Sequence, residues 1–308
     1  MKSSNIGGQA VLEGIMMKNG DSYAVAVRKP DGIIVLQKET YASVIKWEKL
    51  IKIPFVRGVF NFIDSMVLGM KTLTYSASFF EEEEDTKIKS EIEINKNEKK
   101  EKLMMSITIG FSIILAVAIF MVLPYFLVSL FNKSIPSFAV RSIIEGVVRL
   151  SIFIGYILLI SRMKDIKRVF MYHGAEHKCI NCIEHGLELT VENVRKSSKQ
   201  HKRCGTSFLL FVMVISMILF FFIQVDSPLL RVLLRIVLVP VIAGISYEII
   251  KLAGRSDNFI ISMLSKPGMW LQNLTTKEPE DDMIEVAIVA VESVFDWKVY
   301  LKENFGER

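Results

Sequence analysis

All four histidines and all three cysteines of this 308-residue chain lie between His173 and Cys204. Within that stretch, the run HGAEH at positions 173–177 reads H-x-x-E-H, with two imidazoles four residues apart and a carboxylate beside the second. Residues i and i+4 share one face of a helix, so both rings can reach the same ion. This spacing is the inverted arrangement of zinc peptidases. It predicts a divalent metal, most consistent with zinc, held by His173 and His177 with Glu176 as general base.

A catalytic zinc site needs a third protein ligand. Glu184 lies seven residues beyond His177, which is about 10 Å along a helix at ~1.5 Å per residue, too far to serve the same ion. The other candidates are nearby coordinating side chains and one carboxylate near the end of an apolar segment, where a charge is costly without a partner. They are His201, Cys204, Glu192, Glu188 and Glu248. We predict that the metal ligands come from His173, His177, His201, Cys204 and Glu248.

Two other interpretations of the same residues remain open. In the first, His173, His177, His201 and Cys204 close a tetrahedron around a structural metal and leave no position for a substrate. In the second, the histidines lie in a polar loop and bind nothing. The pair Cys179-x-x-Cys182 has no second pair to complete a zinc ribbon, so packed or free thiols are the better interpretation.

The composition indicates alternating membrane and soluble segments, because the mean hydropathy is +0.37 although 23% of the residues are charged. Four apolar segments approach or exceed the ~20 residues that cross a bilayer. They cover residues 103–131, 143–160, 206–225 and 228–252. The second segment carries Glu145 and Arg149, which we expect to neutralise each other or to meet Arg235 across a helical bundle.

Lysine and arginine set the expected orientation in the membrane. Residues 162–205 contain ten of them, whereas the connectors near 132–141 and 224–228 hold only Lys133 and Arg141. The histidine loop is therefore predicted to be cytoplasmic, and four spans place both termini on the same side, in a bacterial inner membrane. The first residues lack the pattern of a secretory signal, which agrees with that orientation. The same orientation explains the net charge of +5, so we expect no nucleic-acid partner.

The remaining segments complete the predicted fold, which is mainly α with a small N-terminal α+β domain. Residues 23–28 and 33–39 predict a β-hairpin around a Pro-Asp-Gly turn, and Pro54 begins a helix with one apolar face. That face is expected to lie on the membrane surface or to pack on the hairpin. The predicted divisions are an N-terminal domain at 1–80, a charged linker at 81–102, spans at 103–161 and 206–253, the histidine loop at 162–205, and a helical tail at 254–308.

The second span is predicted to continue as one helix through Tyr172 to Glu184 and to end at Gly186. In the tail, a helix is expected at about 279–296, because Pro279 suits a first turn and acidic residues that complement the helix dipole follow it. The glycine-rich run at 7–14 matches neither a dinucleotide fingerprint nor a P-loop, and a tight turn is the better prediction there.

Several motifs together resemble the YqhQ-like family of uncharacterised bacterial membrane proteins. These motifs are GGQAVLEGIMM, PFVRGVFNFIDSMVLGMKTL, YHGAEHK, LTVENVRKSSKQHKRCGTSF and SYE, and they extend over nearly the whole chain. The resemblance implies a metal-dependent enzyme without naming a substrate. It also implies that the family's polar motif positions correspond to His173, Glu176, His177, His201, Cys204 and Glu13.

Together these observations predict a membrane-bound, metal-dependent hydrolase that acts at the cytoplasmic membrane surface on a peptide or lipid-like substrate. Membrane lipids and a second copy of the chain are further expected partners. The alternative is a non-catalytic membrane scaffold with a structural metal site. A transporter is a third hypothesis, and the small number of intramembrane charges argues against it.

Overall fold

The computed structural model describes residues 2–43, 53–80, 91–131, 133–135, 137–223, 225, 227–254 and 258–306. Contacts divide the chain into two units. The first contains Met1–Phe80, Ile157–Ile215 and Val239–Arg308, and the second contains Glu81–Tyr156 and Ser216–Leu238. The start of the predicted linker, at 81–90, lies outside the described residues, as do residues 255–257.

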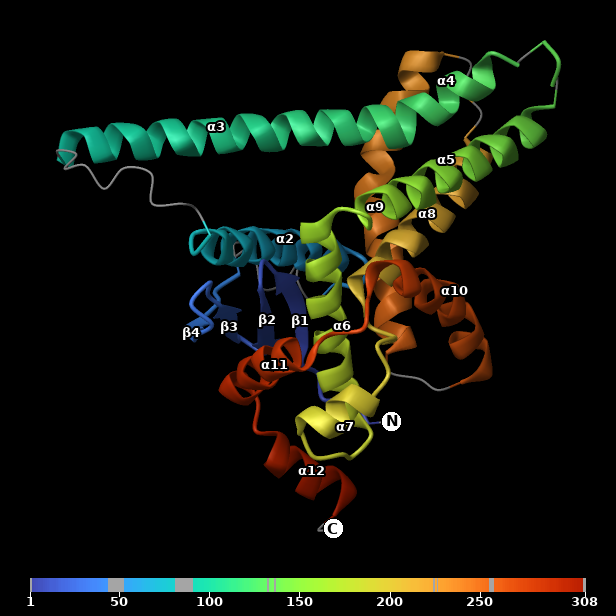
Figure 1. Ribbon diagram of the computed structural model, residues 1–308. Helices are drawn as coiled ribbons and strands as arrows, with labels where there is room; N and C mark the ends of the chain where they lie inside the picture. The colour runs from blue at the N-terminus through green and yellow to red at the C-terminus, as the bar shows by residue number, and fades with distance from the viewer. Residues whose placement is uncertain are drawn as a thin grey trace. The chain divides into compact units, whose positions relative to one another are not determined.

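The N-terminal residues form a four-stranded antiparallel sheet in the order β1-β2-β3-β4 (Figure 1). The strands are β1 (Gly7–Val11), β2 (Gly14–Asn19), β3 (Ser22–Arg28) and β4 (Ile34–Thr40). The predicted hairpin is confirmed as β3 and β4. The tight turn predicted in the glycine-rich run is also present at Leu12 and Glu13, where Glu13 has φ 47, but the two strands that it joins were not predicted.

Helices cover both faces of this sheet. On one face, Val11, Met16, Val25 and Val27 pack with Leu68 of helix α2 (Val56–Ala77). On the other face, Ile15, Met17 and Ala26 pack against helices α6 (Lys164–Glu184) and α11 (Asp281–Val294). Alternate residues of a strand point to opposite faces. Because both faces are buried, β2 and β3 are apolar along most of their length and show no simple alternation of polar residues.

Helix α2 contacts the sheet with its side of small residues. Gly69, Thr72 and Ser76 are buried there, and Ser76 Oγ accepts a hydrogen bond from the backbone N–H of Leu12 at 3.1 Å. The apolar stripe predicted for this helix lies on another side and is exposed in the described structure. All of its predicted members are exposed except Val59, which is half-buried. They are Phe55, Val59, Phe62, Ile63, Met66, Val67 and Met70. The stripe therefore does not pack on the hairpin, which was one of its two predicted positions.

Helix α6 is separate from the preceding helix, which corrects the prediction of one continuous helix. Helix α5 (Phe138–Ile160) ends before a three-residue connection, in which Met163 is extended with φ −69 and ψ 135. Helix α6 then begins at Lys164 and ends where predicted, with Gly186 in the left-handed region at φ 80. Neither glycine nor proline occupies residues 161–163, so the sequence carries no strong signal for the break.

The remaining elements of the first unit follow the histidine stretch. Helix α7 (Val191–Lys196) is capped by Thr190, whose side chain accepts a hydrogen bond from the N–H of Asn193. Helix α10 (Phe259–Thr275) precedes α11. Helix α11 confirms the helix predicted at about 279–296, and α12 (Trp297–Phe305) follows it. Cys179 and Cys182 are buried as free thiols, and both belong to the core between α6 and the sheet.

Four helices of the described chain are long and apolar enough to cross a membrane, as predicted. The candidate spans are Ser106–Ser129, Phe138–Ile160, Gly205–Phe222 and Leu229–Ala253. The first combines the end of α3 (Glu91–Val117), a π-helical turn η1 (Ala118–Val122) and α4 (Leu123–Ser129). Pro124 lacks an N–H and crowds the preceding turn, which accounts for the widened π turn before it. Helix α8 (Gly205–Phe222) and helix α9 (Pro228–Ala253) contain the last two spans.

A buried ion cluster lies in the second unit. Arg149 Nη2 donates to Glu145 Oε1 at 2.9 Å, and Arg235 Nη2 donates to the other oxygen of Glu145 at 2.9 Å. Arg149 also donates to Ser216 Oγ at 3.2 Å. The expected meeting of Glu145, Arg149 and Arg235 is therefore present. One carboxylate shared by two guanidinium groups links α5 to α9 in an apolar setting, where unpaired charges are costly.

Candidate metal centre

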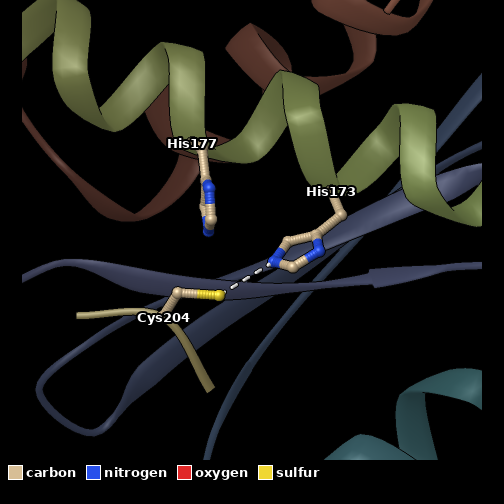
Figure 2. A group of neighbouring side chains, drawn as sticks. All are labelled: His173, His177 and Cys204. Atoms are coloured by element: carbon tan, nitrogen blue, oxygen red, sulfur yellow. Dashed lines mark hydrogen bonds between the residues drawn. The ribbon is translucent and has the colours of Figure 1, made fainter. Parts of the chain in front are cut away.

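Three potential metal ligands converge between α6 and the segment that precedes α8 (Figure 2). His173 and His177 lie one turn apart on α6, and their ring centroids are 4.4 Å apart. Cys204 comes from the loop before α8 and places its Sγ 3.3 Å from His173 Nε2. One donor atom from each of the three residues lies within 4.8 Å of the others. The helical spacing of the histidines therefore produces the shared face that the sequence predicted.

Backbone carbonyls orient both imidazoles. His173 Nδ1 lies 2.9 Å from the carbonyl oxygen of Thr275, and His177 Nδ1 lies 2.7 Å from that of Lys199. A carbonyl oxygen can only accept a hydrogen bond, so each Nδ1 carries a proton and Nε2 is the ring nitrogen left to face a metal. A hydrogen bond from the second ring nitrogen is the usual support for a metal-bound histidine. Both rings are thus prepared to coordinate through Nε2.

The electrostatics of Cys204 favour a thiolate. Its burial opposes ionisation, but the imidazoles of His173 and His177 outweigh burial and hold the pKa of the thiol well below its ordinary value. Burial likewise acts to lower the pKa of His173, and the sulfur of Cys204 together with Glu176 raises it to about 9. Thr206 also contacts the sulfur, with its Oγ1 at 3.0 Å. A zinc ion would bind the thiolate and the neutral imidazole, so its binding would release the proton that His173 holds on Nε2.

The donor set fits a divalent zinc ion. Zn–N bonds of about 2.0–2.1 Å and Zn–S bonds of about 2.3 Å place the ligand atoms of a tetrahedral site roughly 3.3–3.7 Å apart. Cys204 Sγ and His173 Nε2 lie 3.3 Å apart, slightly closer than the separation of about 3.5 Å expected for a nitrogen and a sulfur on one tetrahedral zinc ion. Two nitrogens and one sulfur leave a fourth position, which in catalytic zinc sites belongs to water or substrate.

Glu176 lies beside this cluster on the same helix. Its side chain is almost fully buried, and its Oε2 lies 4.0 Å from His173 Nε2. It lines both a small cavity of about 100 Å³, shared with His173, His177 and Cys204, and a larger cavity next to it. A carboxylate so placed can reach a water molecule at the open position without being one of the three grouped ligands.

His201 lies near the cluster but is engaged elsewhere. Its Nε2 lies 3.3 Å from Glu184 Oε2, and its Nδ1 accepts a hydrogen bond from the N–H of Arg203 at 3.4 Å. Gln272 further fixes the backbone of His201, because its side-chain amide exchanges two hydrogen bonds of 2.8 Å with that backbone. Both ring nitrogens of His201 are therefore occupied, and the structure does not bring it into the group of three ligands.

Glu184 is fully buried and anchors the N-terminus to α6. Its Oε1 accepts hydrogen bonds from the N–H of Ser4 at 2.7 Å and from the hydroxyl of Ser4 at 2.8 Å. Arg203 pairs with the same carboxylate. Burial opposes ionisation, yet His201, Arg203 and the Ser4 N–H together lower the pKa of Glu184 to about 2. The sequence excluded Glu184 as a ligand and gave no sign of this anchoring role, because its partners lie far apart along the chain.

The other predicted acidic candidates lie outside the group of three. Glu248 pairs with Arg57, which donates from Nε at 2.6 Å. Glu13, at the turn between β1 and β2, forms a two-point ion pair with Arg168 of α6. Glu192 is exposed and pairs with Lys196. Glu188 is exposed on the loop before α7.

Gly174 allows the segment after α10 to reach His173. A Cβ at position 174 would lie 2.0 Å from the carbonyl oxygen of Lys277, and the N–H of Lys277 donates to the carbonyl of Phe170 at 2.9 Å. This close approach holds the Thr275 carbonyl that orients His173. The sequence motif contains this glycine between the two histidines, but its packing role depends on a segment a hundred residues away.

We expect Gly174→Ala to destabilise the protein by about 1–3 kcal/mol, because the added methyl group must displace backbone rather than a flexible side chain. Metal affinity should fall as well, since displacing Lys277 frees the Nδ1 of His173. Thermal unfolding and metal titration of the purified protein measure both effects. Gly155→Ala is the matched control, because a Cβ at that helical position meets no atom within 4 Å. Equal behaviour of the two variants would contradict the packing role.

A larger cavity of about 560 Å³ adjoins two of the three ligands, His173 and Cys204. Its lining includes β1 residues 8–10, His173, Glu176 and Cys204, together with side chains from α2, α8 and α9. The apolar part of the wall is formed by Phe62, Phe170, Phe208, Leu209 and Ile250. A volume of this size is typical of pockets that bind small molecules or short segments of chain. The candidate metal centre therefore opens onto a space that can hold a substrate.

The part of the chain that the structure describes combines four helices of membrane-spanning length with a three-ligand candidate metal centre next to a small sheet. The chain belongs to the family described as Protein of unknown function (DUF1385), whose model matches residues 53–297. It is 36% identical over 301 residues to the Uncharacterized protein YqhQ of Bacillus subtilis (strain 168), which covers 97% of this chain and 94% of that protein. No solved structure matches the chain.

Proposed function

We propose that this protein is a metal-dependent hydrolase, with zinc as the metal, that acts at a membrane surface. The observation that carries this proposal is the convergence of His173, His177 and Cys204. Two of these ligands and the neighbouring Glu176 line an open cavity. The residues would hold one divalent ion through two Nε2 atoms and one Sγ. A closed structural site would need a fourth protein ligand, and the ring nitrogens of His201 are already committed to Glu184 and Arg203.

When bound, the metal supplies Lewis-acid activation of water and of the substrate carbonyl. In the proposed reaction Glu176 acts as general base and takes one proton from the attacking water, whose oxygen forms a bond to the carbonyl carbon. Glu176 then gives that proton to the leaving group as the bond between carbon and the leaving atom breaks. The products are an acid and an amine or alcohol, so one water molecule is consumed and no redox partner is needed.

The proposed location follows from the elements around the cavity. Helix α8 begins one residue after Cys204, and α9 contributes Tyr247 and Ile250 near its end, so both candidate spans meet the soluble elements at the site. The exposed apolar stripe of α2 continues from this region, because Phe62 contacts Phe208 with ring centroids 5.3 Å apart. We propose that this stripe lies on lipid, and that the excess of lysine and arginine places this side in the cytoplasm.

Elemental analysis of the detergent-purified protein tests the proposal. The wild type should carry about one zinc per chain, and His173→Ala, His177→Ala and Cys204→Ser should each lose most of it. Cys182→Ser is the matched control, because Cys182 is another buried free thiol of the same stretch outside the group of ligands. His201→Ala separates the two kinds of site. Retention of metal supports the open, catalytic site, whereas loss equal to that of His173→Ala supports a closed structural site. A metal-free wild type would overturn both.

A further inference from the structure

We propose that the free edge of β1 binds an extended peptide segment as an added strand and guides its backbone past Glu176. This inference rests on the proposed function and specifies its substrate class, a polypeptide with apolar side chains. The test below measures binding separately from metal content and from turnover.

The register of the sheet shows which backbone groups of β1 point outward. β1 is an edge strand, and its partner β2 lies on one side only. Val11 pairs with Gly14 across the two-residue turn, so this pair exchanges hydrogen bonds, and the pairs alternate from there along the ladder. The N–H and C=O groups of Gly8 and Ala10 therefore point away from β2. The N–H of Leu12, next in this alternation, leaves the sheet and donates to Ser76.

No hydrogen bond from elsewhere in the described chain reaches these groups of Gly8 and Ala10. Unpaired N–H and C=O groups on a sheet edge form a template for another strand, and natural proteins usually cover such edges. Here the edge borders the cavity of about 560 Å³, whose lining includes Gly8 and Ala10. Two donors and two acceptors are thus presented to whatever enters.

The helices on the two faces of the sheet extend the slot beyond β1. Helix α2 covers one face and contributes Asn61, Phe62 and Ser65 to the cavity, while α6 covers the other face and contributes Phe170 and His173. A strand added to β1 would therefore lie between two helical walls, as β1 itself does. Its side chains would alternate between those walls, and each wall offers a phenylalanine.

The chemistry of the lining favours a peptide over a phospholipid. Arg203 is the one guanidinium or ammonium group that lines the cavity in the described structure, and it is paired with Glu184 and with the hydroxyl of Ser3. A phosphate would find no unpaired cation there. An acyl chain would fill the apolar walls but would leave the edge groups of Gly8 and Ala10 without partners, which carries a free-energy cost when water is excluded.

The position of Gly8 brings this edge to the catalytic carboxylate. A Cβ at position 8 would lie 3.0 Å from Cγ of Glu176, so β1 and Glu176 are in direct contact. Gly7 and Gly8 of β1 line the small cavity together with His173, His177 and Cys204. A peptide paired with Gly8 therefore runs next to the general base and the metal ligands, which is the placement that hydrolysis of its backbone requires.

A binding experiment with a defined probe tests this inference. The probe is a fluorescein-labelled, capped pentapeptide, Leu-Val-Phe-Val-Leu, compared with the same peptide N-methylated at alternate backbone nitrogens. Binding to the full-length, detergent-purified Glu176→Gln protein is followed by fluorescence anisotropy. N-methylation on the pairing edge removes donors without changing the protein, so we expect affinity to fall about tenfold or more. Ala10→Pro removes the outward N–H and should weaken the unmodified peptide similarly, whereas Ala10→Ser keeps it and should bind normally.

The outcomes separate this inference from the proposed function. Equal binding of both peptides, or no binding at about 1 mM peptide, overturns the added strand even if the protein contains zinc. Equal binding of both peptides together with displacement by a lysophospholipid would identify a lipid-binding cavity instead. Loss of zinc in His173→Ala with unchanged, N-methyl-sensitive peptide binding would support the inference, since binding through β1 does not need the ion. If Ala10→Pro fails to fold, the comparison of the two peptides still decides.

Discussion

Glu176→Gln will lower hydrolytic turnover by about 10²–10⁴-fold and leave the zinc content unchanged. Glutamine has nearly the same size as glutamate and keeps the packing of a buried side chain, but its amide cannot take a proton from water. The measurement is mass spectrometry of the products formed from a mixture of apolar peptides and a membrane lipid extract by the purified, zinc-loaded protein. Zinc is determined on the same samples.

Glu188→Gln is the control for this prediction, because Glu188 is an exposed glutamate of the same region. Its turnover should equal that of the wild type. Full turnover by Glu176→Gln would exclude Glu176 as general base. Loss of zinc from that variant would instead make Glu176 a ligand, and the role of base would pass to another group. Products confined to the lipid extract would leave the hydrolase in place and contradict a peptide substrate.

The parts of the fold that the sequence predicted are those with strong local signals. Length and hydropathy are sufficient to identify the four candidate spans, and the Pro-Asp-Gly turn identifies β3 and β4. The hairpin of β1 and β2 was missed because its strands are short and rich in glycine and because both faces are buried, so no alternating pattern marks them. The break between α5 and α6 was missed because residues 161–163 contain no helix-breaking residue.

The candidate site was predictable where one helix carries it. Helical periodicity places His173, Glu176 and His177 on one face of α6, and the structure groups the two histidines. The choice between His201 and Cys204 was not predictable. Both precede α8 in a short loop, and their directions depend on Glu184 and Gln272, which are distant in sequence. The carbonyls of Thr275 and Lys199 give no sequence signal at all, because any residue supplies a backbone oxygen.

Replacement of Glu184 by glutamine will destabilise the protein by about 3–5 kcal/mol, the range expected when one partner of a buried ion pair is removed. Glu184 has no exposed surface, and its loss leaves Arg203 and His201 without their shared counter-ion. The N-terminal residues should also detach, because Ser4 loses an ionic acceptor for two hydrogen bonds. Denaturant unfolding in detergent, followed by tryptophan fluorescence, measures the change.

The pH dependence of the same group has a definite sign. The pKa of Glu184 is lowered to about 2 in the folded protein from an ordinary value of 4.5. A carboxylate with a lowered folded-state pKa stabilises the protein above its unfolded pKa and loses that contribution as the pH falls through the folded value. Wild-type stability should therefore decrease by about 3 kcal/mol more than that of Glu184→Gln between pH 5 and pH 2.

Glu192→Gln separates this effect from a general loss of acidic charge. Glu192 also pairs with a cation, Lys196, but both side chains are largely exposed. An exposed pair contributes little because water screens it, so we expect no measurable change in the free energy of unfolding and the same loss of stability in acid as the wild type. Equal effects of the two substitutions would show that the buried cluster of Glu184, His201 and Arg203 does not hold the N-terminus against α6. The position of β1 beside Glu176 would then need another cause.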